Sequence, residues 1–243
     1  MNYKSIINAV AVAVAVMAVM FVGCGGDDDD DNGGGGGGGG GTPTVKTGTF
    51  TDSRDSKSYN WVEIGTQKWM AENLNYAASG SKCGNESSGM LTENSTACNK
   101  YGRLYNWATA VDGSPSSSSS PSGVQGACPV GWHLPSDAEW TTLTDAVGGA
   151  STAGVKLKAT SGWNDYQERS GNGTNDYGFA ALPGGFGTMG SGFTFNGTNG
   201  RWWSATVNNA SNVWYRDMSY NNEYVLRTSG YDEVLFSVRC VED

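Results

Sequence analysis

The chain has 243 residues and a formal net charge of −9 at pH 7. Five of its acidic residues are consecutive aspartates at 27–31, so the rest of the chain is only mildly acidic. Phosphate binding requires clustered Lys and Arg side chains, and the sequence contains no such cluster. Composition and charge therefore exclude nucleic acid as a partner.

Residues 1–23 have the features of a bacterial lipoprotein signal peptide. Lys4 precedes an unbroken apolar run at 9–22, which is shorter than the ~20 residues of a membrane-spanning helix and suits a signal-peptide core. The run ends in FVGC, which resembles a lipobox. We therefore expect Cys24 to be lipidated and to anchor the protein to a membrane. An ordinary secretory signal with an unrelated cysteine is the alternative.

Residues 24–48 are predicted to form a flexible tether between the lipid and the domain. The five aspartates repel one another, and nine consecutive glycines follow at 33–41. Acidic residues just after a lipidated cysteine resemble the surface-export signals of some Gram-negative lipoproteins. Gly25 does not resemble an inner-membrane retention signal. The expected location is the outer membrane with display at the cell surface, and a periplasm-facing lipoprotein is the alternative.

The domain is predicted to span residues 49–243 and to begin with extended elements. Residues 49–66 alternate and contain aromatic and β-branched side chains, which predicts a hairpin with Asp55 and Ser56 near its turn. Residues 67–76 are predicted to form a short strand and a turn.

Two helices are predicted in the first half of the domain. Residues 100–111 carry apolar side chains at helical spacing. Ser136 and Glu139 match the capping box of a helix at 137–147, and Asp137 lies in its first turn, where the helix dipole favours negative charge.

Beyond Gly154 the helical periodicity is lost, and short strand-like pieces are separated by Gly and Asn. The pieces are GVKLKATSGW, YGFAALPGGF, RWWSATV, NVWYRDMSY, EYVLRT and LFSVRCV. The predicted fold class is therefore α+β, with two helices, short antiparallel strands and long loops.

Four cysteines follow Cys24, and they are Cys83, Cys98, Cys128 and Cys240. An even number in an exported domain predicts disulfides, although four cysteines allow three pairings. Cys83 and Cys98 bracket a loop rich in Ser, Gly and Asn, which makes a local bond natural and would leave Cys128 to pair with Cys240. Zinc is disfavoured because the chain has no C-x-x-C motif and only one histidine.

Seven motifs occur in an order that resembles one family. They are WMAENLNY, YGRLYNWATA, CPVGWHLPSDAEWTTL, GVKLKATSGW, YGFAALPGGFG, RWWSAT and FSVRCV, within residues 50–241. Together they resemble the Fibrobacter succinogenes major paralogous domain family, a set of surface or secreted proteins of which many are lipidated. This resemblance implies no particular activity.

The motifs HLPSDAEW and VRCV are also similar to the formylglycine-generating sulfatase-modifying family. That resemblance implies a C-type-lectin-like fold and supports a Cys128–Cys240 bond. The oxidases of that family use a further cysteine pair in the C-terminal half, but residues 129–239 contain no cysteine. We therefore predict that the domain is not an enzyme, and a relative with altered catalytic chemistry is the alternative.

Two features of the sequence suggest chemistry other than simple binding, namely a Cys–His pair and a set of acidic residues. His133 follows Cys128 closely, but a nucleophilic cysteine must be free, and Cys128 is expected in a disulfide. Asp165, Glu168 and Asp176 carry the hard oxygen ligands that calcium prefers, without the spacing of an EF-hand. A bound Ca²⁺ is thus an alternative, and no other cofactor is expected.

Nine tryptophans are many for a chain of this length. Most are expected in the core, but exposed rings stack on sugar faces, and the candidates for this role are Trp163, Trp202, Trp203 and Trp214. Neighbours in a strand point to opposite faces, so only one of Trp202 and Trp203 is expected in the core. We therefore expect non-enzymatic binding to a polysaccharide or another extracellular partner, with a structural envelope protein as a further alternative.

Overall fold

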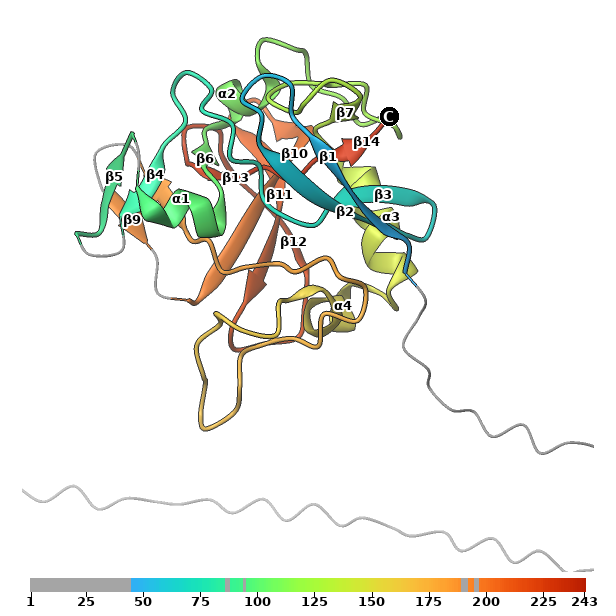
Figure 1. Ribbon diagram of the computed structural model, residues 1–243, viewed down its shortest axis with the longest axis vertical. Helices are drawn as coiled ribbons and strands as arrows, with labels where there is room; N and C mark the ends of the chain where they lie inside the picture. Colours follow the sequence, from blue (N-terminus) through green and yellow to red (C-terminus); the bar gives the residue numbers. More distant parts are fainter. Residues whose placement is uncertain (1–44, 86–87, 94, 189–191, 195–196) are drawn as a thin grey trace, which may run out of the picture. The chain divides into compact units, whose positions relative to one another are not determined.

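The computed structural model describes residues 45–85, 88–93, 95–188, 192–194 and 197–243. These residues form four helices, two five-stranded sheets and two small hairpins (Figure 1), so the fold is mixed α+β, as predicted. The predicted signal peptide, Cys24 and most of the predicted tether lie outside the described residues.

The first sheet has the strand order β1-β2-β3-β14-β7 and is antiparallel throughout. Its strands are β1 (Thr47–Thr51), β2 (Ser58–Ile64), β3 (Gln67–Met70), β14 (Val241–Glu242) and β7 (Trp132–His133). β1 and β2 form the predicted hairpin, with Ser56 at φ 59 in its turn. β14 lies between β3 and β7, which brings the end of the described chain against the strand that follows the hairpin.

The second sheet has the strand order β12-β11-β10-β13-β6. Its strands are β12 (Leu226–Tyr231), β11 (Asn212–Ser219), β10 (Asn199–Asn209), β13 (Phe236–Ser237) and β6 (Leu104–Tyr105). β10 and β13 are parallel, and the other pairs are antiparallel. β10 is the middle strand and is longer than the piece RWWSATV that the sequence predicted, whereas β11 nearly coincides with the predicted piece NVWYRDMSY.

Two small hairpins complete the β-structure. One is formed by β4 (Cys83–Asn85) and β5 (Met90–Thr92), and the other by β8 (Phe186–Thr188) and β9 (Gly192–Thr194). The two hairpins contact each other through β5 and β9 (Figure 1).

The single helix predicted at 100–111 is instead two short helices, α1 (Thr96–Tyr101) and α2 (Trp107–Val111). Gly102 separates them at φ 76, and a Cβ there would lie 2.7 Å from the Cβ of Asn73. The chain therefore turns tightly against a neighbouring segment, in a conformation that favours glycine, and continues into β6 rather than into another helical turn.

The helix α3 (Asp137–Ala146) begins as predicted, whereas α4 (Ala150–Leu157) was not predicted. In α3, the Ser136 hydroxyl accepts from the Glu139 N–H, and the Glu139 carboxylate accepts from the Ser136 N–H. In α4, Gly154 donates its N–H to the carbonyl oxygen of Glu223 at 2.8 Å. A Cβ on Gly154 would lie 2.6 Å from that oxygen, so glycine permits a close approach that sequence periodicity does not register.

Every helix in the described part of the chain is too short or too polar to cross a membrane.

Two disulfides join segments that lie apart in the sequence. Cys83–Cys98 links β4 to α1, and Cys128–Cys240 links the segment before β7 to the segment before β14. The structure thus contains disulfides, as predicted. Cys128 and Cys240 are fully buried in a core cluster that includes Trp203.

Candidate functional site

The two adjacent tryptophans of β10 are both core residues. Trp202 and Trp203 each have an exposed fraction of 0%. Trp202 packs with Trp140 of α3, whereas Trp203 packs with Tyr215 and Phe236. The two rings enter different core clusters, but β10 is the middle strand of its sheet and both of its faces are covered. The prediction that one of the two lies outside the core is therefore wrong.

The other two candidate tryptophans differ in exposure. Trp163 is 4% exposed, and its Nε1 donates to the carbonyl oxygen of Ala181 at 2.9 Å, so it is also a core residue. Trp214 is half-buried on β11, and the guanidinium carbon of Arg227 lies 3.5 Å from its ring centroid. Of the four candidates, only Trp214 keeps an exposed part, and Arg227 covers one face of its ring.

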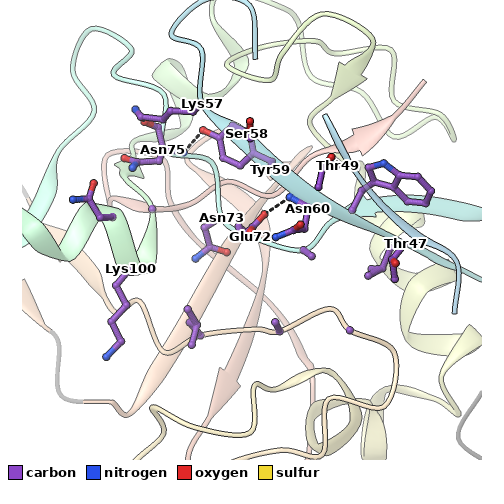
Figure 2. Close-up of a pocket in the computed structure, with 18 of the residues that line it drawn as sticks. Thr47, Thr49, Lys57, Ser58, Tyr59, Asn60, Glu72, Asn73, Asn75 and Lys100 are labelled. Carbon is purple, nitrogen blue, oxygen red and sulfur yellow. Dashed lines mark hydrogen bonds between the residues drawn. The ribbon is translucent and has the colours of Figure 1, made fainter. Parts of the chain in front are cut away.

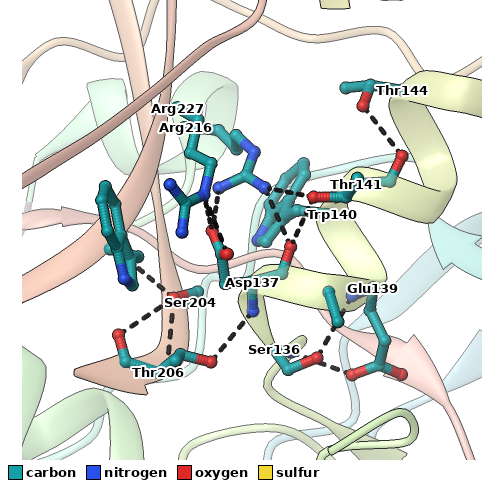
Figure 3. Close-up of polar contacts among 12 residues, drawn as sticks. Ser136, Asp137, Glu139, Trp140, Thr141, Thr144, Ser204, Thr206, Arg216 and Arg227 are labelled. Atoms are coloured by element: carbon teal, nitrogen blue, oxygen red, sulfur yellow. Dashed lines mark hydrogen bonds and ion pairs between the residues drawn. The ribbon is translucent and has the colours of Figure 1, made fainter. Parts of the chain in front are cut away.

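Asp137 holds the arginine that covers Trp214 (Figure 3). Its carboxylate accepts from Arg227 Nε at 2.9 Å and from Arg216 Nη1 at 2.6 Å. Burial lowers the pKa of Arg216, and the Asp137 carboxylate partly offsets that shift. These ion pairs connect the first turn of α3 to β11 and β12. They explain the positions of the three side chains by a structural role.

His133 is buried between two carboxylates. Its Nδ1 lies 2.8 Å from Oδ1 of Asp243, and its Nε2 lies 2.7 Å from Oε1 of Glu139. Burial would lower the pKa of His133, but the hydrogen bonds and charges of Glu139 and Asp243 outweigh it and raise the pKa above its usual value. The second oxygen of Glu139 accepts from the N–H of Ser136, which fixes the carboxylate beside the imidazole.

The Cys–His nucleophile has no thiol to use, because the sulfur of Cys128 is bonded to Cys240. Among the described residues, no three His, Cys, Asp or Glu side chains are arranged so that they could hold a metal ion together. The calcium candidates Asp165, Glu168 and Asp176 are therefore not brought together as a ligand set.

A cleft of about 780 Å³ lies between the β1–β2 hairpin, residues 71–75 and α1 (Figure 2). Segment 178–182 forms a further wall. The lining contains hydroxyl and amide side chains that can donate and accept hydrogen bonds, and they include Thr47, Thr49, Ser58, Asn60, Asn75 and Asn99. This is the strongest candidate for a binding site in the described part of the chain.

Glu72 is fixed at the centre of the cleft by Asn60. The carboxylate accepts from the backbone N–H of Asn60 at 2.6 Å and from its side-chain Nδ2 at 2.6 Å (Figure 2). Two bonds from one residue hold the carboxylate in one orientation, and hydrogen bonds to a charged group are stronger than neutral ones. Glu72 thus presents a preformed acceptor to the cleft.

Trp61 lines the same cleft and is half-buried. Gly48 is its partner across the β1–β2 ladder, and a Cβ on Gly48 would lie 2.5 Å from the Trp61 ring. The glycine therefore makes room for the indole against β1. Lys68 Nζ lies 4.4 Å from the centroid of the Trp61 ring and forms a cation–π contact with it.

Arg239 contacts two of the segments that surround the cleft. It is 0% exposed, and its Nη2 donates to Oδ1 of Asn73 at 2.6 Å, while Nη1 donates to the carbonyl oxygen of Phe179. One guanidinium therefore links the segment of Asn73 to the wall at 178–182. Burial lowers the pKa of Arg239 to about 9, and the carboxylate of Glu72 opposes this shift.

The wall itself contains a strained residue. Ala180 has φ 51, a left-handed conformation that side chains other than glycine rarely adopt. Its N–H donates to Oδ1 of Asn175 at 2.7 Å, which holds this conformation in place. Strained backbone of this kind is concentrated at functional sites.

The sequence-based candidates did not include Trp61, Asn60 or Glu72. Asn60 and Trp61 lie in the predicted hairpin, so their strand was predicted although their place in a cleft was not. The signal that could have found the site is the motif AENLNY after β3, where a carboxylate and two amides follow one another. Their approach to the hairpin depends on tertiary packing.

No curated protein and no solved structure matches this chain significantly. A family model matches residues 62–242, which is more than half of the chain. The match includes the segment of Glu72, α3 and the terminal strand β14, but it begins after β1. The chain therefore belongs to the Fibrobacter succinogenes major domain family.

Proposed function

We propose that this protein is a cell-surface lipoprotein whose domain binds an extracellular polysaccharide without catalysis. The observation that carries this proposal is the cleft, whose lining includes Trp61 and in which Glu72 is preset by Asn60. Sugars expose hydroxyl groups and apolar ring faces together, and such ligands need placed hydrogen-bonding groups beside an aromatic ring.

The proposed location and anchor come from the sequence. Lipidation at Cys24 would hold the protein at the outer membrane, and a flexible tether between Cys24 and β1, which begins at Thr47, would have a root-mean-square reach of about 25–30 Å. Such a reach favours capture of an extended polymer outside the membrane.

The proposal includes a C-type-lectin-like fold. Support comes from the mixed α+β class, from the capping box that opens α3 shortly after Cys128, and from the disulfide between Cys128 and Cys240. A fold does not determine function, so the ligand is argued from the cleft and not from this likeness.

The absence of catalysis is proposed on the chemistry of the cysteines. Cys83, Cys98, Cys128 and Cys240 all lie in disulfides, so oxidase chemistry that needs free thiols has none to use among them. Turnover of a cysteine-containing peptide by the purified protein would contradict this part of the proposal and favour an altered sulfatase-modifying enzyme.

The test is the binding of the full-length protein, kept in detergent, to a set of plant and bacterial glycans. Trp61→Ala should weaken binding about tenfold, which corresponds to about 1.4 kcal/mol. Glu72→Gln removes the charged acceptor and should weaken binding by a similar factor.

Trp214→Ala is the matched control, because Trp214 is also half-buried but lies outside the cleft. It should leave binding unchanged. Loss of binding in Trp214→Ala with none in Trp61→Ala would move the site to the surface around Arg227. Failure to bind any glycan would favour a structural role in the envelope.

A further inference from the structure

We infer that the polysaccharide bound in the cleft is neutral, and that two adjacent free hydroxyl groups of one sugar ring donate to Glu72. This inference rests on the proposed glycan binding and specifies its ligand class. It is carried by the hydrogen-bond acceptors that Glu72 and Asn60 place together and by the balance of charge in the lining.

Both carboxylate oxygens of Glu72 act as acceptors. Oε2 accepts from the backbone N–H of Asn60, and Oε1 accepts from its side-chain Nδ2 (Figure 2). This pattern suits an ionised carboxylate, which accepts at about four lone-pair sites and donates at none. Glu72 therefore offers a ligand a further acceptor position on each oxygen.

Asn60 adds an acceptor beside the carboxylate. Its Nδ2 donates to Glu72, which orients the amide, and its Oδ1 makes no hydrogen bond to any of the described residues. The residue is exposed, so that oxygen is accessible to a ligand. Glu72 and Asn60 together form a group rich in acceptors, and a complementary ligand presents donors to it.

Two hydroxyls on neighbouring carbons of a sugar ring provide such donors. Their O–H groups can point to the same side and reach both oxygens of one carboxylate, as the paired N–H groups of an arginine do. The second hydrogen on Nδ2 of Asn60 can donate to a hydroxyl oxygen in return. A carboxylate fixed in this way favours an adjacent pair of hydroxyls over an isolated one.

The charged residues that line the cleft balance one another. They are Lys57, Lys100 and Glu72. Lys57 forms an ion pair with Asp55 at 2.9 Å, and Lys100 Nζ lies 4.6 Å from the centroid of the Tyr101 ring. Because Asp55 neutralises Lys57, the charges of Lys100 and Glu72 leave the lining without an excess of either sign.

Charged sugars fit this lining less well than neutral ones. A uronate would bring its anion beside Glu72, which forms no ion pair with the described residues. Arg239 is completely buried and does not line the cleft, so a ligand anion would not reach it. An amino sugar would bring its cation into a cleft that Lys57 and Lys100 also line. Like charges placed together weaken binding, so a neutral ring is favoured.

The experiment measures the binding of hexasaccharides to the full-length protein in detergent by calorimetry. Xylohexaose and mannohexaose are both neutral, and they present adjacent hydroxyls in two different geometries. The one that binds more tightly is compared with its own O-acetylated form, which should bind about tenfold more weakly because the hydroxyl donors are lost. Hexagalacturonate keeps adjacent hydroxyls but adds a carboxylate to each ring. It should bind about fivefold more weakly than the neutral ligand at low salt, and less so at high salt.

Glu72→Gln should weaken binding of the neutral hexasaccharide about tenfold and reduce its advantage over the acetylated form to about twofold, because an amide can donate to an acetyl carbonyl. A purely structural role of Glu72 would not change this ratio. Glu63→Gln is the matched control, because Glu63 lies on the same strand as Asn60 and does not line the cleft. It should keep the native affinities, and thermal unfolding should show that both variants are folded.

Equal or tighter binding of the acetylated form or of hexagalacturonate would overturn this inference and leave glycan binding intact. So would a protein that binds other glycans but neither neutral hexasaccharide, or a Glu72→Gln variant that keeps the native ratio. A protein that binds no glycan of any kind would overturn the proposed function as well, so the two failures are distinguishable.

Discussion

The core around β10 and the cleft beside β2 contain the same kinds of residues, but their tryptophans differ in how deeply they are buried. Each has a strand tryptophan and a disulfide: Trp203 and Cys128–Cys240 in the core, Trp61 and Cys83–Cys98 at the cleft, which Cys98 lines. β10 is the third of five strands and is covered on both faces, whereas β2 lies next to the edge strand β1. Trp61 packs against the same core cluster as Trp203 but stays half-buried beside the edge strand, whereas Trp203 is fully covered.

The two disulfides should differ most clearly in how much their removal lowers the free energy of unfolding. In the chain-entropy model, removal of Cys128–Cys240 by a double substitution to alanine lowers the free energy of unfolding by about 4–5 kcal/mol. Removal of Cys83–Cys98 costs about 3 kcal/mol, because that bond closes a loop of only 15 residues.

Denaturant unfolding monitored by tryptophan fluorescence measures both costs. A larger loss for Cys83–Cys98 would show that the cleft depends on its disulfide more than the core does, and equal losses would contradict the expected difference.

The two tryptophans give the next contrast. Trp203→Ala removes a fully buried ring that donates from Nε1 to the carbonyl oxygen of Tyr105 at 2.7 Å, and it should cost about 3–5 kcal/mol. Trp61→Ala removes a half-buried ring and should cost about 1 kcal/mol.

Thermal unfolding of the two variants tests this, with Trp203→Phe and Trp61→Phe as matched conservative changes. A loss above about 3 kcal/mol for Trp61→Ala would mean that its ring supports the fold rather than a ligand.

The elements that could be predicted are those with local signals. The capping box at Ser136 and Glu139 places the start of α3, and alternation places the β1–β2 hairpin. The division at Gly102 and the helix through Gly154 could not be predicted, because each depends on a close contact with a distant segment.

The candidate site shows the same limit more sharply. Period-two alternation predicts that one of the adjacent tryptophans of β10 lies outside the core. This prediction fails because both faces of β10 are covered. Asn60 and Glu72 are separated by β3 in the sequence, and only the packing of residues 71–75 against the hairpin joins them. Hydrogen-bonding partners that only tertiary packing brings together cannot be recognised from their spacing in the sequence.

The smallest expected effect on stability comes from His133. Like the core residues it is buried, and like the cleft residues it lines a pocket, which it shares with Lys68 and Glu242. Its pKa in the folded protein is raised by Glu139 and Asp243. A raised pKa contributes stability that is fully present below the unfolded value of about 6.5 and is lost as pH rises through the folded value. The midpoint of thermal unfolding should therefore fall as the pH rises above about 6.5.

His133→Gln isolates this contribution, because glutamine keeps hydrogen-bonding capacity and cannot carry the charge. The variant should lose the dependence on pH above about 6.5 that the native protein shows. Glu242→Gln is the control, since Glu242 lies in the same pocket but pairs with Lys68. It should retain the dependence. A native protein whose unfolding midpoint rises over this range would contradict the assignment, because the stabilising partner of the two carboxylates would then be the neutral imidazole and not its cation.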